Sequence, residues 1–260
     1  MNNRISYTGL WCLLMILTGS VFTACQKKTD TLESAFPEDY LNLQKGKYIL
    51  YTLDSMRFVN FGQQDTTIHY QAKDVVDEQL TDAGGRTGWR IIRYLRPADN
   101  QQEAAWKADI TYTIFPSRET IEVVENNFRF QKLKLPVREG FSWFGNTHLS
   151  DNPLDILHSF SNDEDMRYWN YTYEQVGAPA VINGMNFDNT LIVHQVADSV
   201  NVPIVYPQGL AYKNYWVEQY AEGIGLIHKE AIMWEYQPPN GSSPGYRTGF
   251  GIKMEIIGHN

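Results

Sequence analysis

Alternation of apolar and polar side chains is the feature that most constrains the fold of this 260-residue chain. It is clearest between residues 106 and 114, where an apolar row alternates with a polar one. The apolar row is Trp106, Ala108, Ile110, Tyr112 and Ile114, and the polar row is Lys107, Asp109, Thr111 and Thr113. Successive side chains of a strand point to opposite faces, so the pattern predicts a strand with one buried face.

Rougher alternation recurs along most of the chain, with turn-forming pairs such as Asn126-Asn127 and Asn183-Gly184 between the runs. The predicted strands are residues 48–58, 67–76, 89–95, 119–124, 128–135, 166–175, 190–196, 212–220, 225–236 and 248–257. Only residues 152–160 have the apolar spacing of a short helix, with Pro153 in its first turn. Closely spaced strands without intervening helices predict an all-β fold, an antiparallel meander that forms a barrel, a half-barrel or a sandwich.

The sequence also suggests an internal repeat. The motif Leu43-x-x-Gly46-x-x-Ile49 is echoed by Val137-x-x-Gly140-x-x-Trp143, and an aromatic strand follows each copy. On this hypothesis the β domain, residues 45–260, consists of duplicated halves at 45–136 and 137–260. The spacings of later landmarks differ between the halves, so the ordinary rhythm of a β meander is the alternative.

The N-terminus has the layout of a secretory signal. Arg4 is the only charge in residues 1–24, and a mainly apolar stretch follows it. The stretch ends in Val21-Phe22-Thr23-Ala24-Cys25, which resembles a bacterial lipobox. The resemblance implies a leader cleaved after Ala24 and diacylglycerol on the Cys25 thiol. The polar residues that follow, up to 44, are interpreted as a flexible tether. The alternative is a secreted protein whose ordinary signal ends near a cysteine.

Cysteine and charge content narrow the function classes. Cys12 and Cys25 are the only cysteines, so a mature lipidated chain has no disulfide and no cysteine metal site. Residues 25–260 contain 21 basic and 30 acidic residues without a basic run, which argues against nucleic-acid binding. The predicted link to the membrane is therefore the acyl group alone.

A second resemblance concerns the domain itself. Residues 43–51 and the segment Tyr220-Ala221-Glu222-Gly223-Ile224-Gly225-Leu226-Ile227 resemble landmarks in a family of uncharacterised outer-membrane lipoproteins of Bacteroidetes-type bacteria. The resemblance covers most of residues 36–258. It implies a cell-envelope lipoprotein and supplies no catalytic residue.

No motif identifies catalysis, a cofactor or a metal. The six histidines lack the i, i+4 spacing of a helical zinc site, and no Gly-x-Ser-x-Gly, P-loop or dinucleotide-binding glycine motif is present. Histidines and carboxylates gather in residues 148–165 without calcium-loop spacing, which favours a solvated acidic loop. Glu122 and Glu125 are expected on different sides of a strand rather than as an acid/base couple. We therefore assign no catalytic residue, no metal ligand and no cofactor.

Aromatic strand faces are the remaining lead. The candidate ligand-binding residues are Trp169, Tyr171 and Tyr173 on one strand and Tyr212, Trp216 and Tyr220 on another. Mixed with polar neighbours, such rings are suited to a groove that stacks on sugars or holds an apolar chain. The alternative is that they are core residues. The favoured function is a non-enzymatic binding or envelope-assembly lipoprotein with a glycan, lipid or protein ligand. A cell-wall or polysaccharide hydrolase and a purely structural envelope subunit are the alternatives.

The residues after Cys25 bear on localisation. No aspartate follows it directly, which fits the outer membrane if the sorting rule of enteric bacteria applies. Bacteroidetes-type lipoproteins that are sent to the cell surface resemble one another in carrying acidic residues just after the lipidated cysteine. This chain has Lys27 and Lys28 there instead. The pair favours the periplasm-facing leaflet over the cell surface, although Asp30 and Glu33 lie close by.

Overall fold

The computed structural model describes residues 35–155, 157–158, 160, 163 and 165–260. The predicted leader, Cys25 and the tether as far as residue 34 lie outside these described residues. The compact unit that the model describes begins at this boundary and extends to Asn260.

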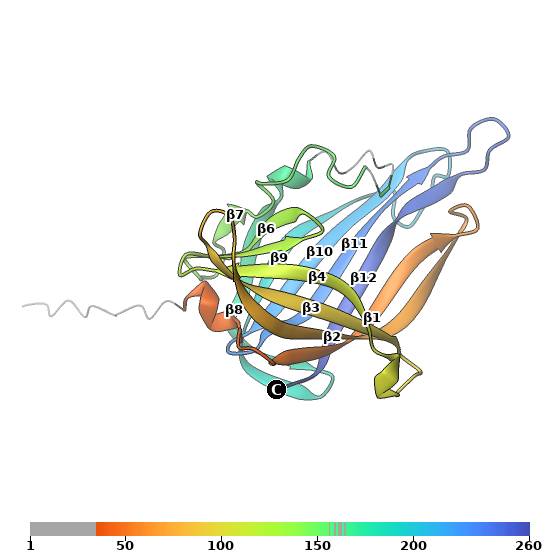
Figure 1. The fold of residues 1–260 in the computed structure, drawn as a ribbon. Coiled ribbons are helices and arrows are strands. Elements are labelled where there is room, and N and C mark those ends of the chain that lie inside the picture. The colour runs from red at the N-terminus through yellow and green to blue at the C-terminus, as the bar shows by residue number, and fades with distance from the viewer. Residues whose placement is uncertain (1–34, 156, 159, 161–162, 164) are drawn as a thin grey trace, which may run out of the picture. The chain divides into compact units, whose positions relative to one another are not determined.

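This unit is nearly all antiparallel β-structure (Figure 1), which confirms the predicted fold class. The first six strands are β1 (Tyr48–Val59), β2 (Gln64–Thr81), β3 (Thr87–Pro97), β4 (Lys107–Pro116), β5 (Thr120–Glu125) and β6 (Phe128–Lys134). The other six are β7 (Ser142–Phe144), β8 (Asn170–Ile182), β9 (Met185–Val200), β10 (Ala211–Ala221), β11 (Gly225–Gln237) and β12 (Tyr246–His259). Each predicted strand overlaps one of these, and only the three-residue β7 had no counterpart in the prediction.

Helical structure in the described part of the chain is limited to the 3-10 turns η1 (Pro37–Tyr40), η2 (Glu103–Ala105) and η3 (Met166–Tyr168). The helix expected over residues 152–160 is reduced to turns among its described residues, where the N–H groups of Leu157 and His158 both donate to the Leu154 carbonyl. Its apolar spacing reflects the packing of Leu154 and Phe160 into the core, where they are 7% and 8% exposed. No helix in the described segments is long and apolar enough to cross a membrane.

The strands form one sheet in the order β6-β5-β4-β3-β2-β1-β12-β11-β10-β9-β8-β7. The two end strands are consecutive in the chain, and they meet again in space. The N–H of Gln131 in β6 donates to the Gly145 carbonyl just after β7 at 2.8 Å, and Trp143 Nε1 donates to the Gln131 carbonyl at 2.8 Å. The sheet therefore curves into a nearly closed barrel rather than a sandwich, and the first strands face β10 and β11 across it (Figure 1).

Glycine is required where the barrel closes. A Cβ on Gly145 would lie 2.3 Å from the ring of Tyr171, which is fully buried beneath it. Such a distance is far below van der Waals contact, so any side chain here would push β7 away from β8.

The alternation seen in the sequence decides which side chains face the barrel interior. On β4, Tyr112 and Ile114 line the interior, whereas Thr111 and Thr113 do not. The hairpin between β8 and β9 turns at Asn183 and Gly184, with φ of 50° and 79°. Both positive values are those of a two-residue turn that matches strand twist, as the Asn-Gly pair predicted.

Residues before the predicted start of the β domain at residue 45 also pack into its core. Tyr40, in η1, is 1% exposed, and its hydroxyl donates to Asn189 Oδ1 at 3.3 Å. Leu41 packs against the same core. The last ten residues of the predicted tether, 35–44, thus include side chains that belong to the folded unit.

The two glycines that the repeat hypothesis aligns are in similar surroundings. Gly46 has φ of 84° and donates its N–H to Val76 in β2, and Gly140 has φ of 72° and donates its N–H to Tyr173 in β8. Each glycine thus contacts the second strand of its own half. Duplication itself stays a prediction.

Candidate functional site

A cavity lies inside the barrel, between β1–β6 on one side and β10–β11 on the other. The cavity leaves about 100 Å³ open to the centres of water-sized molecules. Its exposed lining residues, His259 and Asn260, mark the mouth at the C-terminal end of β12. The cavity is therefore open at one end and narrow inside.

Aliphatic side chains form a large part of the wall because inward positions of five strands carry isoleucine or valine. These residues are Ile49, Val76, Ile91, Ile114, Ile121 and Val123. Ile91 and Ile121 are 3% and 1% exposed, so the apolar wall continues deep into the barrel. Leu41 and Leu43 of the segment that follows η1 also line the cavity.

Two groups of charged residues interrupt this wall. The first joins β2, β3 and β4: Arg93 Nε and Nη2 donate to the two oxygens of Asp74, both at 2.6 Å, and the Tyr112 hydroxyl donates to Asp74 at 2.9 Å. The Arg93 and Asp74 side chains are 11% and 6% exposed. Burial raises the pKa of Tyr112 well above its ordinary value, and the charge of Asp74 adds to this effect.

The second group joins β6, β10 and β11. Lys132 Nζ donates to Glu218 Oε1 at 2.7 Å, and the Tyr220 hydroxyl donates to Glu218 Oε2 at 2.8 Å. Lys229 Nζ lies 3.7 Å from the same Oε1. Burial alone would raise the pKa of Glu218, but the attraction of Lys132 and Lys229 outweighs it and holds this pKa below its usual value.

Glu125, at the end of β5, also lines the cavity. Glu122 does not, so the two carboxylates lie on opposite sides of β5 as expected. No hydrogen bond or ion pair joins the Glu125 carboxylate to another of the described residues. It acts on Lys132 and Arg93 only as a more distant charge.

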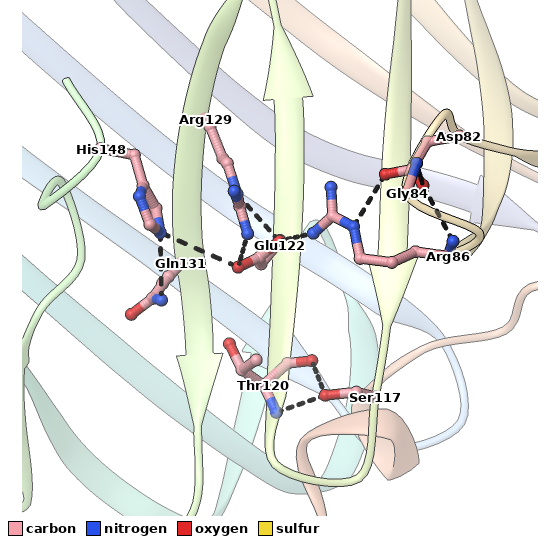
Figure 2. Close-up of polar contacts among 9 residues, drawn as sticks. All are labelled: Asp82, Gly84, Arg86, Ser117, Thr120, Glu122, Arg129, Gln131 and His148. Atoms are coloured by element: carbon pink, nitrogen blue, oxygen red, sulfur yellow. Dashed lines mark hydrogen bonds and ion pairs between the residues drawn. The ribbon is translucent and has the colours of Figure 1, made fainter.

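On the outer side of β5, Glu122 anchors a separate network that Figure 2 shows. Its carboxylate accepts hydrogen bonds from Arg86 Nη1 at 2.6 Å and Arg129 Nη2 at 2.7 Å, while His148 Nε2 lies 4.0 Å away. Burial would raise the pKa of Glu122, but the hydrogen bonds from Arg129 and Arg86 hold it below its usual value. Arg86 also pairs with Asp82, so two cations meet two anions. This balanced network ties the β2–β3 turn to β5 and β6.

In the acidic loop, residues 148–165, the described side chains contact different partners and do not converge on one point. Arg167 pairs with Asp151 at 2.6 Å, and Asp163 Oδ2 accepts the N–H of Leu154 at 3.0 Å. Within the described ranges, no group of three or more His, Cys, Asp or Glu side chains is arranged to hold a metal ion.

The aromatic candidates from the sequence lie mainly inside the barrel. Tyr220 lines the cavity, whereas Trp169 and Trp216 pack edge to face, with ring centroids 5.3 Å apart. The Tyr171 hydroxyl donates to Asn146 Oδ1 at 2.6 Å, and the Tyr173 hydroxyl donates to the Lys134 carbonyl at 2.9 Å. These five are 0–8% exposed.

Tyr212 is the more exposed member of the set, and its hydroxyl donates to Asp198 at 2.9 Å. The structure brings Tyr220 to the cavity and gives the others packing or hydrogen-bonding partners in the barrel wall. Ligand binding by these six residues stays a prediction.

The cavity charges Asp74, Arg93, Lys132 and Lys229 were not singled out from the sequence. A signal was present, since Arg93 stands two residues after Ile91 and Lys132 two residues after Phe130, at inward positions of their strands. A charge within an apolar row marks either a bulge or a buried polar site.

No protein-family model and no curated protein matches the sequence. Among solved structures, an exported protein with a YmcC-like fold from Bacteroides fragilis is 11% identical, with a TM-score of 0.37 over 86% of this chain and 100% of that chain. A DUF1329 family protein from Desulfovibrio piger is 12% identical, with a TM-score of 0.20 over 83% and 85% of the two chains. A protein from Vibrio parahaemolyticus, described as an outer membrane lipoprotein-sorting protein domain, is 10% identical, with a TM-score of 0.19 over 84% and 86%. Similarity at this level does not transfer a ligand or a role to this chain.

Proposed function

We propose that this chain is a lipid-anchored protein of the cell envelope that binds an amphiphilic molecule in its barrel and catalyses no reaction on it. The observation that carries the proposal is the cavity, which has an aliphatic wall along five strands and is open at one end. A core that only stabilises a fold is filled to high density, whereas a carrier keeps space for its cargo.

The dimensions favour an apolar chain over a bulky ligand. About 100 Å³ is open to the centres of water-sized molecules, which is far less than the roughly 300–1,000 Å³ of sites for drug-sized ligands. The narrow interior fits a ligand one chain wide. Each methylene moved from water to such a wall contributes about 0.8 kcal/mol, so an acyl chain gains affinity steadily with length.

Two of the three carboxylates that line the cavity, Asp74 and Glu218, do not favour the hydrolase alternative. A glycosidase needs one carboxylic acid with a raised pKa that donates a proton to the leaving group. Asp74 accepts hydrogen bonds from Nε and Nη2 of Arg93, and the pKa of Glu218 is lowered rather than raised. A lowered pKa keeps Glu218 ionised, as an ion-pair partner and not as an acid.

The anchor belongs to the same proposal and is supported by the sequence alone. A leader over residues 1–24, acylation of Cys25 and a tether toward the barrel would hold the domain on the outer membrane, facing the periplasm. A cargo-binding domain on such a tether samples the adjacent membrane while staying attached to it.

Neighbouring valines on β5 allow a direct test. Val123 lines the cavity, and Val124 is the next residue along the strand and does not. The measurement is the fluorescence of N-phenyl-1-naphthylamine, an uncharged probe that brightens in apolar surroundings. Val123→Trp fills the cavity and should abolish the probe signal, and Val124→Trp is the matched control that should keep it. Equal binding by both variants, each folded by circular dichroism, would show that the probe does not enter the cavity.

A further inference from the structure

A buried lysine and a half-buried lysine in the cavity share one carboxylate. The Lys132 and Lys229 side chains are 6% and 18% exposed, and the Glu218 side chain between them is 3% exposed. Each oxygen of Glu218 already accepts a hydrogen bond, Oε1 from Lys132 and Oε2 from Tyr220. Lys229 Nζ, at 3.7 Å, lies beyond hydrogen-bond length.

The charge count distinguishes the cluster of Lys132, Lys229 and Glu218 from two other ion-paired groups of the barrel. Arg93 and Asp74 pair one to one, and the Glu122 network has two cations and two anions. The cluster of Lys132, Lys229 and Glu218 has one positive charge in excess. Excess charge away from water is costly unless an anion compensates it.

Glu125, a further carboxylate that lines the cavity, compensates weakly. Burial lowers the pKa of Lys132, and the attraction of Glu218 opposes this effect. The repulsion from Lys229 comes next in size, and it exceeds the attraction from Glu125. Among the described residues, Glu218 is therefore the one carboxylate in contact with the two lysines, and Glu125 acts on them only from a distance.

We propose that Lys132 and Lys229 bind the anionic head of the amphiphile, a carboxylate or a phosphate, while its apolar chain lies along the isoleucine and valine wall. Lys229 supplies the free ammonium donors, and the Lys132–Glu218 pair holds the site in place. This assignment rests on the proposed function and adds the class of ligand to it. Hydrogen bonds to charged groups contribute about 1.5–3 kcal/mol, which corresponds to a preference of roughly tenfold or more for the anion.

The test compares ligands that share one apolar chain: decanoate, decyl phosphate and uncharged decanol, each displacing N-phenyl-1-naphthylamine from the full mature protein. The wild type should bind both anions about tenfold more tightly than decanol or better. Lys229→Met keeps the length of the side chain without its charge and should bind all three alike. Lys253→Gln, on the outer face of β12 with a side chain 46% exposed, is the control and should behave as wild type.

The outcomes separate the two proposals. Equal affinities in the wild type, or an anion preference that survives in Lys229→Met, would overturn the lysine site and leave cargo binding intact. Failure of every chain-bearing ligand to displace the probe would overturn both. Inorganic phosphate tests for a free anion as the true ligand. Displacement by phosphate as efficient as by decyl phosphate would mean that the chain adds nothing, and would refute the amphiphile assignment.

Discussion

Replacement of Asp74 by Asn is expected to destabilise the barrel strongly, because it removes the counter-charge of a buried guanidinium. Arg93 Nε and Nη2 each donate to Asp74 at 2.6 Å, and both side chains are largely shielded from water. Asparagine offers one neutral oxygen in place of two charged ones. Arg93 then stays in the interior without an anion in contact.

The magnitude follows from this burial. Removing one partner of a buried ion pair costs about 3–5 kcal/mol. The Tyr112 hydroxyl, 2.9 Å from Asp74, loses a charged acceptor as well, which favours the upper part of that range. Domains of this size lose roughly 2–4 °C per kcal/mol, so the melting temperature should fall by about 6–20 °C.

The assay is thermal unfolding followed by circular dichroism, with the protein carrying Cys25→Ser so that no acyl chain is attached. Asp77→Asn is a matched control on the same two strands, since Asp77 pairs with Arg90 at the surface, with side chains 28% and 40% exposed. Its effect should be much smaller, as exposed pairs contribute little. Asp74→Asn with no greater effect than Asp77→Asn would refute the burial argument.

A triple variant distinguishes two effects on stability: the removal of Asp74 alone, which leaves Arg93 without its anion, and the removal of the whole charged group. Asp74→Leu, Arg93→Met and Tyr112→Phe together replace the whole group with apolar side chains of similar size. Buried pairs exchanged in this way are often neutral or stabilising, so most of the lost melting temperature should return. A triple variant as unstable as Asp74→Asn would show that the group has a role in packing that charge does not explain.

Three further predictions concern the anchor and the pH dependence. Cys25→Ser should release the protein into the soluble fraction, and a mutant that stays in the salt-washed membrane pellet at mature size would contradict the anchor. Burial raises the pKa of Tyr40 to about 12 and those of Tyr51, Tyr171 and Tyr220 well above the ordinary 10.0. The folded state therefore keeps protons that the unfolded state releases, so stability should be lost as the pH rises above about 10. Phenolate absorbance should increase together with unfolding, and full titration before unfolding would contradict the burial of these side chains. The pKa of Glu218 is lowered from 4.5, since Lys132 and Lys229 outweigh the effect of burial. Its contribution is present above that pH and lost below it. Urea unfolding should show a smaller acid loss in Glu218→Gln than in wild type, and equal losses would contradict the assignment.

Much of the fold was predictable because strand alternation and turn chemistry are local. The run from Trp106 to Ile114 identified β4, and the pair Asn183-Gly184 identified the β8–β9 turn. The short β7 was missed because three residues carry too little periodicity. The apolar spacing over residues 152–160 predicted a helix, but Leu154 and Phe160 are buried through turns and irregular backbone.

The sequence by itself therefore determined an all-β chain, its turns and the address implied by the residues around Cys25. Only the tertiary structure decided that the sheet closes into a barrel, that a cavity remains inside, and that charged residues meet there. Lys132 and Glu218 are 86 residues apart in the chain, and Arg93 and Asp74 are 19 apart. Alternation assigns a side chain to a face but not to a partner, because the partner depends on strand order, register and curvature. These are set by the summed packing of the whole sheet, and no local segment encodes them.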